Sequence, residues 1–511
     1  MHVPSCVAAE DTDNEQRKEA GSMAKSTEAA AEADEQANRA GRPSPKERIA
    51  RGKAARAKVP LEAHADFRPA PSRDPVALLM RQAETRVPEL VPIRHGRMLV
   101  SPFAFYRGAA IVMAGDLATT STPGLRAQLC GDAHLSNFGA YASAERRLVF
   151  DINDFDETLP GPFEWDVKRL AASFVVAGRE AGFRRKDCRR IALTAVESYR
   201  TAMLEFAGLP ILTIWHVHVD VENVVTQFRS GLKESERKRN RARFEGADSV
   251  VAKAYTRDSL QAVRKLVTAI DGRRQIINAP PLIVPIGELS RYASYVDPIA
   301  LRSMIVGLLG KYRDTLQSDR RFLLDHFRLT DVAHKVVGVG SVGTMAWILL
   351  LESGLDNDAL LLQAKQAQES VLASYVGASE HANQGERVVA GQRLMQATSD
   401  IFLGWVHAPT LRGPDADFYI RQLRDWKASA VLDQMDAVAF TRYARLCGWT
   451  LARAHARSGD RLAIAAYLGE SNRFDNAIAD FAETYAQQNE RDHAALAAAV
   501  ALGAVEARPG V

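Results

Sequence analysis

The stretch "GDAHLSNFG" (residues 131–139) brings an acid, an imidazole and a carboxamide within a few positions of one another, between two glycines. The short run "RAQLC" precedes it, and the run "RRLVFDI" leads into the acidic segment "VFDINDFDET" (residues 149–158). Both runs have the composition of β-strands bounded by turn residues. We therefore expect a strand, a turn and a returning strand that hold Asp132, Asn137 and Asp154 around one point.

The residue types of this set match the needs of phosphoryl transfer from a nucleotide. Such a reaction needs a carboxylate near the acceptor hydroxyl, and a carboxylate and a carboxamide oxygen that hold Mg²⁺. Asn137 follows Asp132 by five positions, which is the offset between the base and the metal-binding Asn in the protein-kinase catalytic loop. The sequence thus predicts Asp132 as the catalytic base, Asn137 and Asp154 as metal ligands, and ATP and Mg as cofactors.

The other polar residues of this stretch have simpler interpretations. A histidine two positions after an aspartate in a turn more often orients a loop than shuttles protons, so His134 of the catalytic loop is assigned a structural or substrate-positioning role. Asp151, Asp156 and Glu157 are interpreted as exposed turn residues. The acidic segment is not a calcium-binding EF-hand loop, because Phe155 stands where the third oxygen ligand belongs.

A second candidate feature, "GVGSVG" (residues 338–343), lies between two runs of strand character. A glycine turn between antiparallel strands is the geometry of the kinase loop that covers nucleotide phosphates with backbone amides. Lys365 ends the third strand, "ALLLQAK", where kinases place the lysine that contacts the α and β phosphates. Its expected partner is Glu386 on the following helix, with Glu369 as the competitor. The predicted cofactor-binding residues are Gly338, Gly340, Ser341, Gly343, Lys365 and Glu386.

The order of these features is reversed relative to kinases, in which the glycine loop and the lysine precede the catalytic loop. We therefore expect an α+β, protein-kinase-like two-lobed fold that is circularly permuted, with a mostly helical large lobe and a small antiparallel-sheet lobe. Permutation is tolerated where chain termini lie close together at a surface. The segment "YARLCGWTLARAHARSGD" (residues 443–460) is expected to be the long helix that leads into the catalytic loop.

The catalytic stretch resembles that of aminoglycoside and choline kinase-like phosphotransferases, whose loop reads Gly-Asp-x-His-x-x-Asn. These four places are filled here by Gly131, Asp132, His134 and Asn137. Cys130 departs from the histidine that usually precedes the glycine, which puts a supporting contact in doubt. The resemblance implies a metal-binding aspartate after the next strand and an Asp-Leu-Ala helix start beyond it, and Asp154 and "DVKRLAAS" at Asp166 fit that spacing better than Asp151 does.

Residues from about 76 to 490 are also similar to the bacterial family catalogued as domain of unknown function 2252. The similarity is carried by the segments "SPFAFYRGAA", "CGDAHLSNFG", "NDFDETLPGPFEWDVKRLAAS", "VVGVGSVGT" and "LARAHARSGD". That family is grouped with kinase-like folds and brings no established substrate. The resemblance therefore implies the fold and leaves the acceptor open.

The chain has 511 residues, of which 47% are hydrophobic and 25% charged, a composition typical of soluble globular proteins. Few aromatic residues occur before residue 75, which indicates a mostly disordered basic leader, with at most a short docked helix. Helical periodicity is expected at 166–207, 248–270 and 383–397, and the basic run 221–247 is either a solvated helix face or a phosphate or partner contact. The expected divisions are the leader (1–75), a helical catalytic lobe (76–330), a nucleotide-covering sheet lobe (331–430) and C-terminal helices completing the helical lobe (431–511).

The balance of charge argues against a nucleic-acid partner, because 66 basic residues stand against 62 acidic ones for a net charge of +4. Four cysteines without C-x-x-C spacing indicate neither a zinc site nor a disulfide framework, and they favour a reducing cytoplasm. The apolar runs are shorter than the roughly 20 residues that span a bilayer, and no export signal is recognisable. We expect a cytoplasmic protein without a membrane partner.

The function that these residues favour is ATP- and Mg-dependent transfer of a phosphoryl group to a small-molecule or protein acceptor that the sequence does not identify. Nucleotidyl transfer is a close variant. The second alternative is a pseudokinase that binds nucleotide or a partner without turnover. The third is a metal-dependent hydrolase built on Asp132, His134 and Asp151, which would need no nucleotide. A purely structural turn at 131–154 remains the simplest alternative, and the oligomeric state is open.

Overall fold

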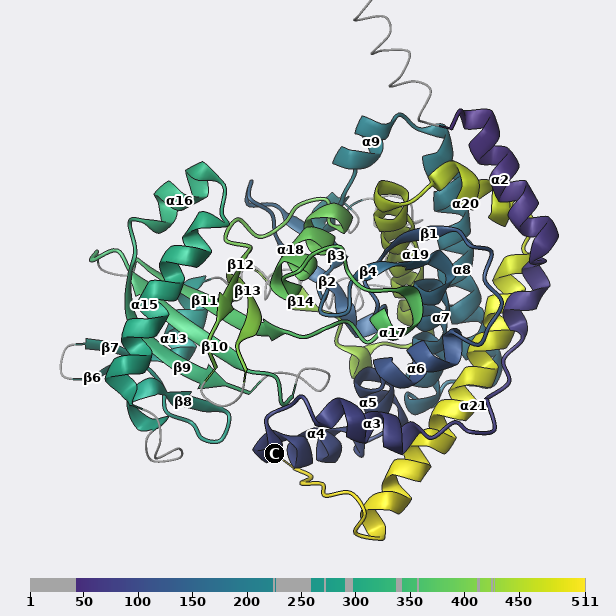
Figure 1. Ribbon diagram of the computed structural model, residues 1–511. Helices are drawn as coiled ribbons and strands as arrows, with labels where there is room; N and C mark the ends of the chain where they lie inside the picture. Colours follow the sequence, from purple (N-terminus) through teal and green to yellow (C-terminus); the bar gives the residue numbers. More distant parts are fainter. Residues whose placement is uncertain are drawn as a thin grey trace, which may run out of the picture.

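The computed structural model describes residues 43–223, 226, 259–270, 273–289, 297–336, 342–355, 358–410, 414–423, 426 and 428–510. Figure 1 shows a part built around a six-stranded antiparallel sheet, called the sheet lobe below, and a mostly helical part, called the helical lobe. The expected mixed α+β class with antiparallel sheets is confirmed. None of the described helices combines the length and the apolar character that crossing a membrane requires.

The sheet lobe contains the strands that the sequence predicts between residues 331 and 430. The strand order is β12-β13-β11-β10-β9-β8. Its strands are β8 (Ile283–Pro285), β9 (Arg328–Lys335), β10 (Ala346–Glu352), β11 (Ala359–Ala367), β12 (Gly404–Ala408) and β13 (Ala416–Gln422). Its helices are α13 (Ser259–Leu266), η4 (Ile286–Glu288), α15 (Pro298–Asp314), α16 (Ser318–Leu324) and α18 (Gln384–Met395), whereas α17 (Ala373–Val376), which follows β11 in the chain, packs on the core of the helical lobe.

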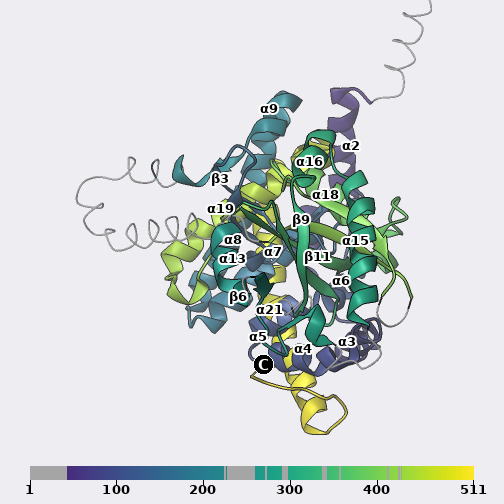
Figure 2. The same cartoon turned by 90° about the vertical axis from the view of Figure 1, so that its left-hand side faces the viewer.

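The central strand β10 is apolar from Ala346 to Leu351 because both of its faces are buried. Leu349 and Leu351 belong to the core that contains Leu301 of α15. Ile348 and Leu350 belong to a separate core, to which α13 contributes. The two helices therefore cover opposite faces of the sheet (Figure 2), which explains an apolar run without the alternation of a half-exposed strand.

The helical lobe is built around α7, α8, α19 and α21, which share one large core. Helices α8 and α19 approach each other closely at Gly448, where a Cβ atom would lie 2.0 Å from the carbonyl oxygen of Ala195. The helices are α2 (Pro45–Lys58), η1 (Leu61–Ala65), α3 (Pro75–Ala83), η2 (Pro88–Leu90), α4 (Val91–Met98), α5 (Pro102–Gly108), α6 (Ala110–Leu117), η3 (Leu135–Asn137), α7 (Phe163–Glu180), α8 (Arg185–Gly208), α9 (Ile211–His216), η6 (Leu432–Gln434), α19 (Ala437–Ser458), α20 (Arg461–Leu468) and α21 (Arg473–Ala501).

The strand pairing around the catalytic loop differs from the expected hairpin. The strand before the loop does not pair with the strand at "RRLVFDI", because a further strand follows the loop directly and takes that place. The pairs are β1 (Arg126–Leu129) with β4 (Leu159–Pro162), and β2 (Phe138–Ala142) with β3 (Leu148–Ile152). The remaining strands are β5 (Val219–Asp220), β6 (Val267–Ile270), β7 (Arg273–Ile276) and β14 (Ala428–Ser429).

The expected long helix before the catalytic loop lies within α19, whose C-terminal end meets β1. The Gln128 N–H donates a hydrogen bond to Ser458 Oγ at 3.3 Å. A Cβ atom on Gly459 would lie 2.9 Å from the Cβ of Ala127. The end of α19 is thus adjacent in space to the strand that enters the catalytic loop, although the two are far apart in the chain.

The leader was expected to be mostly disordered up to residue 75, but residues 43–75 are described and folded, and α2 begins at Pro45. Helix α2 opens with a capping box between Ser44 and Glu47, and it packs along α20. Leu61 and Phe67, which follow it, are buried in the main core. The sequence signal for this helix is the S-x-x-E pattern with proline at the first helical position, which the low aromatic content of the segment obscured.

Two further expectations concern the middle of the chain. The basic run 221–247 lies almost wholly outside the described residues, as does the start of the helix expected over 248–270. The described part of that helix, α13, ends at Leu266, and β6 follows it directly. Two of the three residues after Leu266 are a valine and a threonine, whose branched Cβ atoms favour a strand over a helix.

Candidate active site

The predicted catalytic loop (residues 131–137) is held by hydrogen bonds to the N-terminal part of α7. The backbone N–H groups of Cys130 and Gly131 donate hydrogen bonds to the Asp166 carboxylate at 2.8 and 3.1 Å. Gly131 has a φ of +80°, and a Cβ atom there would lie 2.3 Å from the carbonyl oxygen of Glu157. Glycine is therefore required both by the backbone conformation and by the close approach of the acidic segment.

Replacing Gly131 with alanine should displace this loop. A left-handed conformation costs a non-glycine residue about 1–2 kcal/mol, and the contact with Glu157 adds to that cost. We expect a lower melting temperature and a shift of the neighbouring Asp132. The measurement is thermal unfolding compared with Gly182→Ala, because Gly182 has a φ of +74° but no atom within 4 Å of the place that a Cβ would take. Equal losses for both variants would show that the contact with Glu157 is unimportant.

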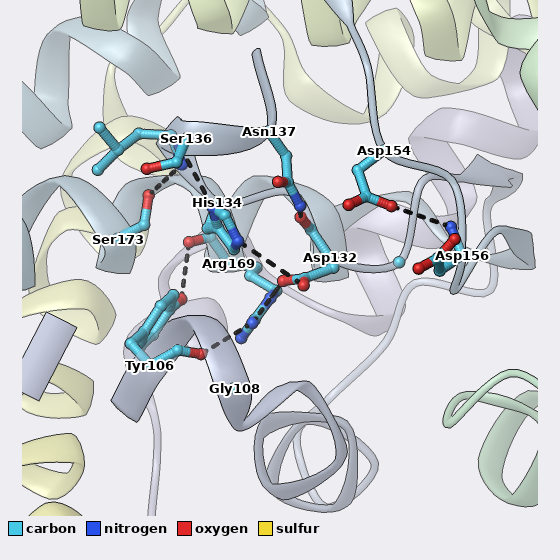
Figure 3. A network of polar contacts seen from close by, with 12 residues as sticks. Tyr106, Gly108, Asp132, His134, Ser136, Asn137, Asp154, Asp156, Arg169 and Ser173 are labelled. Atoms are coloured by element: carbon cyan, nitrogen blue, oxygen red, sulfur yellow. Dashed lines mark hydrogen bonds and ion pairs between the residues drawn. The ribbon is translucent and has the colours of Figure 1, made fainter. Parts of the chain in front are cut away.

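Asp132 is held by one of its two carboxylate oxygens. Arg169 of α7 donates from Nε and Nη2 to Oδ1 at 2.6 and 2.5 Å (Figure 3). The second oxygen, Oδ2, lies 3.8 Å from His134 Nε2. Burial raises the pKa of Asp132, and the positive charges of Arg169 and Arg107 oppose the rise. One oxygen thus fixes the side chain and the other is left to accept a proton.

His134 is buried and contacts the backbone of its own loop, and its expected role stays a prediction. Its Nδ1 accepts a hydrogen bond from the Ser136 N–H at 3.2 Å, and the ring is buried. Burial, with Arg107 and Arg169 nearby, lowers the pKa of His134 well below its ordinary value. The neutral ring therefore stabilises the first turn of η3 without adding a charge next to Asp132.

Asn137 and Asp154 present oxygen atoms from the loop and from the end of β3. Asn137 Nδ2 donates to the carbonyl oxygen of Asp132 at 2.9 Å, which turns the amide nitrogen inward. Asp154 Oδ1 accepts from the Asp156 N–H at 3.3 Å. No donor in the described part of the chain hydrogen-bonds Asn137 Oδ1 or Asp154 Oδ2. Burial and the charge of Asp156 raise the pKa of Asp154, and Lys365 opposes them.

Lys365 reaches this hairpin from β11 of the sheet lobe and forms an ion pair with Asp156, 209 positions away. The Tyr419 hydroxyl donates to the other oxygen of Asp156 at 2.7 Å. Burial lowers the pKa of Lys365, but the carboxylates of Asp156 and Asp154 outweigh it and raise that pKa above its ordinary value. Burial alone would raise the pKa of Asp156, whereas Lys365 lowers it overall. Both groups are therefore charged at neutral pH.

The ion pair of Lys365 corrects two expectations from the sequence. Its partner is Asp156 rather than Glu386 or Glu369, and the Glu386 carboxylate lies 3.6 Å from His381 Nδ1 instead. Asp156 is therefore no exposed turn residue. Helix α18 contributes Arg387, which donates hydrogen bonds to the carbonyl oxygens of Asp156, Thr158 and Gln368 at 2.6–2.8 Å.

Asp151 and Glu157 are also not exposed turn residues. Both carboxylate oxygens of Asp151 accept from Arg453 Nη2 at 2.6 and 2.7 Å, and Asp151 is buried. Glu157 accepts a hydrogen bond from the Val371 N–H at 2.7 Å. Arg453 of α19 and the Ala397 N–H just after α18 cover Asp151, whereas the segment after β11 contacts the half-buried Glu157, and the local sequence reveals neither contact.

A cavity of about 750 Å³ is lined by residues of both lobes and includes five of the ten predicted site residues. Its wall includes Asp132, His134, Asn137 and Asp154 from the helical lobe, and Lys365 and Arg421 from the sheet lobe. Asp151 is not part of the wall. Arg107, Asp156, Arg169, Arg387 and Arg421 were missed by the sequence reasoning. Of these, only Arg169 could have been found from the nearby sequence, because it follows Asp166 by three positions and so lies on the same face of the predicted helix.

The glycine loop can be assessed only in part, because Gly338, Gly340 and Ser341 lie outside the described residues. Gly343 is described and has a φ of +93°. Its carbonyl oxygen accepts a hydrogen bond from the Val87 N–H at 2.7 Å, and a Cβ atom there would lie 2.9 Å from Arg86. Gly343 thus packs on the helical lobe and does not line the cavity.

The oxygen donors of the cavity fit a hard divalent cation. Mg²⁺ commonly takes one or two carboxylates together with substrate phosphates and water, rather than a complete protein cage. Asp154 Oδ2 and Asn137 Oδ1 are such donors. Among the described residues, no three His, Cys, Asp or Glu side chains converge on one point, so a transition-metal cluster of that kind is not found there. Asp154 and Asn137 are therefore suited to bind a cation that is also bound by the phosphates of a ligand.

Comparison with known proteins identifies the family of this chain. A family model described as "Uncharacterized protein conserved in bacteria (DUF2252)" matches residues 86–499, which is most of the chain and includes every residue of the cavity wall named above. No curated protein and no solved structure shows significant similarity to the chain. The chain therefore belongs to the DUF2252 family of bacterial proteins.

Proposed function

We propose that this protein is an ATP- and Mg²⁺-dependent phosphotransferase of the small-molecule kinase type, with a circularly permuted kinase-like fold. The observation that carries the proposal is the ion pair between Lys365, which lines the cavity, and Asp156, which follows the cavity residue Asp154 by two positions. It brings the lysine of the sheet lobe to the hairpin that carries Asp154, although the two segments are far apart in the chain. Both segments also contribute charged side chains to the wall of the same cavity, which favours a shared ligand over separate structural roles.

In the proposed mechanism Asp132 accepts the proton of the acceptor hydroxyl. Its Oδ1 is held by Arg169, so Oδ2 is the oxygen available for the proton. Asn137 and Asp154 would hold Mg²⁺, which neutralises the phosphates when bound. Lys365 would contact the phosphates from the sheet lobe, supported by Asp156. Catalysis would then rest on positioning and on the electrostatic stabilisation of the transferred group.

The order of elements supports the permuted kinase-like fold. Lys365 lies on the third strand of the run β9, β10 and β11, and helix α18 follows, as the lysine strand and helix C do in kinases. The end of α19 lies against β1, which enters the catalytic loop. A chain that ran directly from α19 into β1 would have the order of elements expected before permutation.

The alternatives are supported less well. A metal-dependent hydrolase would need Asp151, which is engaged by Arg453 and lies outside the cavity wall. A pseudokinase would keep the nucleotide site and dispense with Asp132, yet Arg169 fixes this residue with one oxygen left for a proton. Nucleotidyl transfer would use the same groups. The acceptor, a small molecule or a protein, is left to experiment, because fold-level likeness does not transfer substrates.

A thermal-shift screen of nucleotides with and without Mg²⁺ tests the proposal. A ligand at 100 times its Kd stabilises the native state by about 2.7 kcal/mol, so Mg·ATP should raise the melting temperature measurably. Asp154→Asn should lose most of this stabilisation, and the matched control Asp314→Asn, 72% exposed on α15, should keep it. The proposal fails if no nucleotide stabilises the wild-type protein, or if Asp154→Asn responds like the control.

A further inference from the structure

Arg107 of α5 is a cation of the cavity wall for which the described residues provide no hydrogen-bond or ion-pair partner. Its side chain is half-buried and lines the cavity together with Asp132 and Asp154. Its Nε is buried and has no hydrogen-bond partner. Within the described residues, its guanidinium makes no hydrogen bond and no ion pair. Burial lowers the pKa of Arg107, while the charges of Asp132, Asp154 and Glu180 oppose that change, so these carboxylates lie close enough to act on it.

The backbone on either side of Arg107 is fixed. The carbonyl oxygen of Tyr106 accepts from Arg169 Nη2 at 3.1 Å, and the Tyr106 hydroxyl donates to the carbonyl oxygen of Arg169 at 2.7 Å (Figure 3). The carbonyl oxygen of Gly108 accepts from Arg94 Nη2 at 2.7 Å. The backbone at Arg107, near the C-terminal end of α5, is therefore held in place from both sides, which favours the preorganisation that electrostatic catalysis requires.

Arg107 and Arg169 differ in their hydrogen bonding, because within the described residues only Arg169 is hydrogen-bonded. Arg169 donates hydrogen bonds to the Asp132 carboxylate and to the carbonyl oxygen of Tyr106. Arg107 keeps the planar fork of its guanidinium for a ligand, and that fork matches two oxygens of a phosphate. Arg107 is therefore a cation of the helical lobe that can meet an anionic ligand in the cavity.

We propose that Arg107 binds the phosphoryl group during its transfer, as an arginine supplied by the same chain. This inference rests on the proposed function. In the transfer, the acceptor oxygen forms a bond to the γ-phosphorus of ATP while the bond from that phosphorus to the β,γ-bridging oxygen breaks. The electron pair of the broken bond leaves with ADP, and the acceptor proton goes to Asp132 Oδ2. Negative charge develops on the oxygens of the transferred group between Asp132 and Asp154, where Arg107 neutralises it.

The test compares binding of Mg·ADP with binding of Mg·ADP and aluminium fluoride, an analogue of the transferred group. Calorimetry of the full chain measures both dissociation constants for the wild type, Arg107→Gln, Arg107→Lys and the exposed control Arg68→Gln. Arg107→Gln should bind Mg·ADP within about threefold of wild type, but it should lose about 10- to 100-fold of the tightening that fluoride brings, as expected for hydrogen bonds to a charged group. Arg107→Lys should recover part of that loss, because it keeps the charge without the fork.

Each outcome separates this inference from the function on which it rests. Normal Mg·ADP binding with undiminished tightening in Arg107→Gln overturns the role of Arg107 alone. No Mg·ADP binding by the wild type overturns the proposed function together with this inference. If the wild type binds Mg·ADP but aluminium fluoride does not tighten that binding, the proposed phosphoryl transfer is contradicted, and so is the role of Arg107 in it. Because Arg107 makes no hydrogen bond within the described chain, both variants should fold, and their melting temperatures check this.

Discussion

Replacing Asp132 with asparagine should lower ADP formation from Mg·ATP by about 10² to 10⁴, the usual contribution of a general base. Nucleotide binding should change little, because the base acts on the acceptor hydroxyl and contributes little to ground-state affinity. The substitution is conservative for the fold, since the asparagine oxygen can still accept from Arg169. The measurement is ADP formation at saturating Mg·ATP, alone and with candidate acceptors, together with the Kd for Mg·ATP.

The control for this prediction is Asp314→Asn, which makes the same chemical change on the surface of α15 and should leave both quantities unchanged. A loss of binding equal to the loss of turnover would show that Asp132 serves the nucleotide site rather than the reaction. Turnover equal to that of the wild type would remove Asp132 as the base and favour a site without transfer chemistry at this loop.

A chain that begins at residue 76 should fail to fold, although the composition of the leader suggests that it is dispensable. Burial of Leu61 and Phe67 contributes about 1.5–3 kcal/mol each. Arg73 pairs with both Asp116 and Asp492, and its loss leaves these buried carboxylates unpaired at a cost of about 3–5 kcal/mol. Together these losses approach the about 5–15 kcal/mol that stabilise a typical domain.

Circular dichroism and thermal unfolding of two truncated chains check this prediction. The chain that starts at residue 43 keeps α2, η1 and Arg73, so it should unfold cooperatively. The chain that starts at residue 76 should show no cooperative transition or should aggregate. Similar melting temperatures for both chains would mean that the packing of α2 and η1 contributes little to stability.

The sequence predicts those parts of the site that depend on local spacing. The interval from Asp132 to Asn137 and the position of Asp154 after a strand are set by a turn and one hairpin, so they can be read from adjacent residues. Lys365 was also singled out, because it follows an apolar run at a recognisable interval from a glycine turn, although β11 continues beyond it to Ala367. The structure brings all four residues to one cavity.

The partners of these residues could not be predicted, because they depend on how separate elements pack. Asp156 looks like a turn residue until β11 brings Lys365 against it. Arg107 stands in an apolar run whose orientation is set by contacts of α5 with α7. The strand β2 was missed because its five residues, with Gly139 among them, resemble the turn that precedes them. Its pairing with β3 is decided by the burial of both strands.

The most direct test of the central claim is a crystal structure of the full chain with Mg²⁺ and a non-hydrolysable ATP analogue. The account predicts that the phosphates lie in the cavity between Lys365 and the hairpin, with the cation bound by Asn137 and Asp154. The γ-phosphate should be the part nearest Asp132. An analogue bound elsewhere, or a cavity that stays without nucleotide at concentrations that saturate binding in solution, would contradict the kinase-like interpretation of this fold.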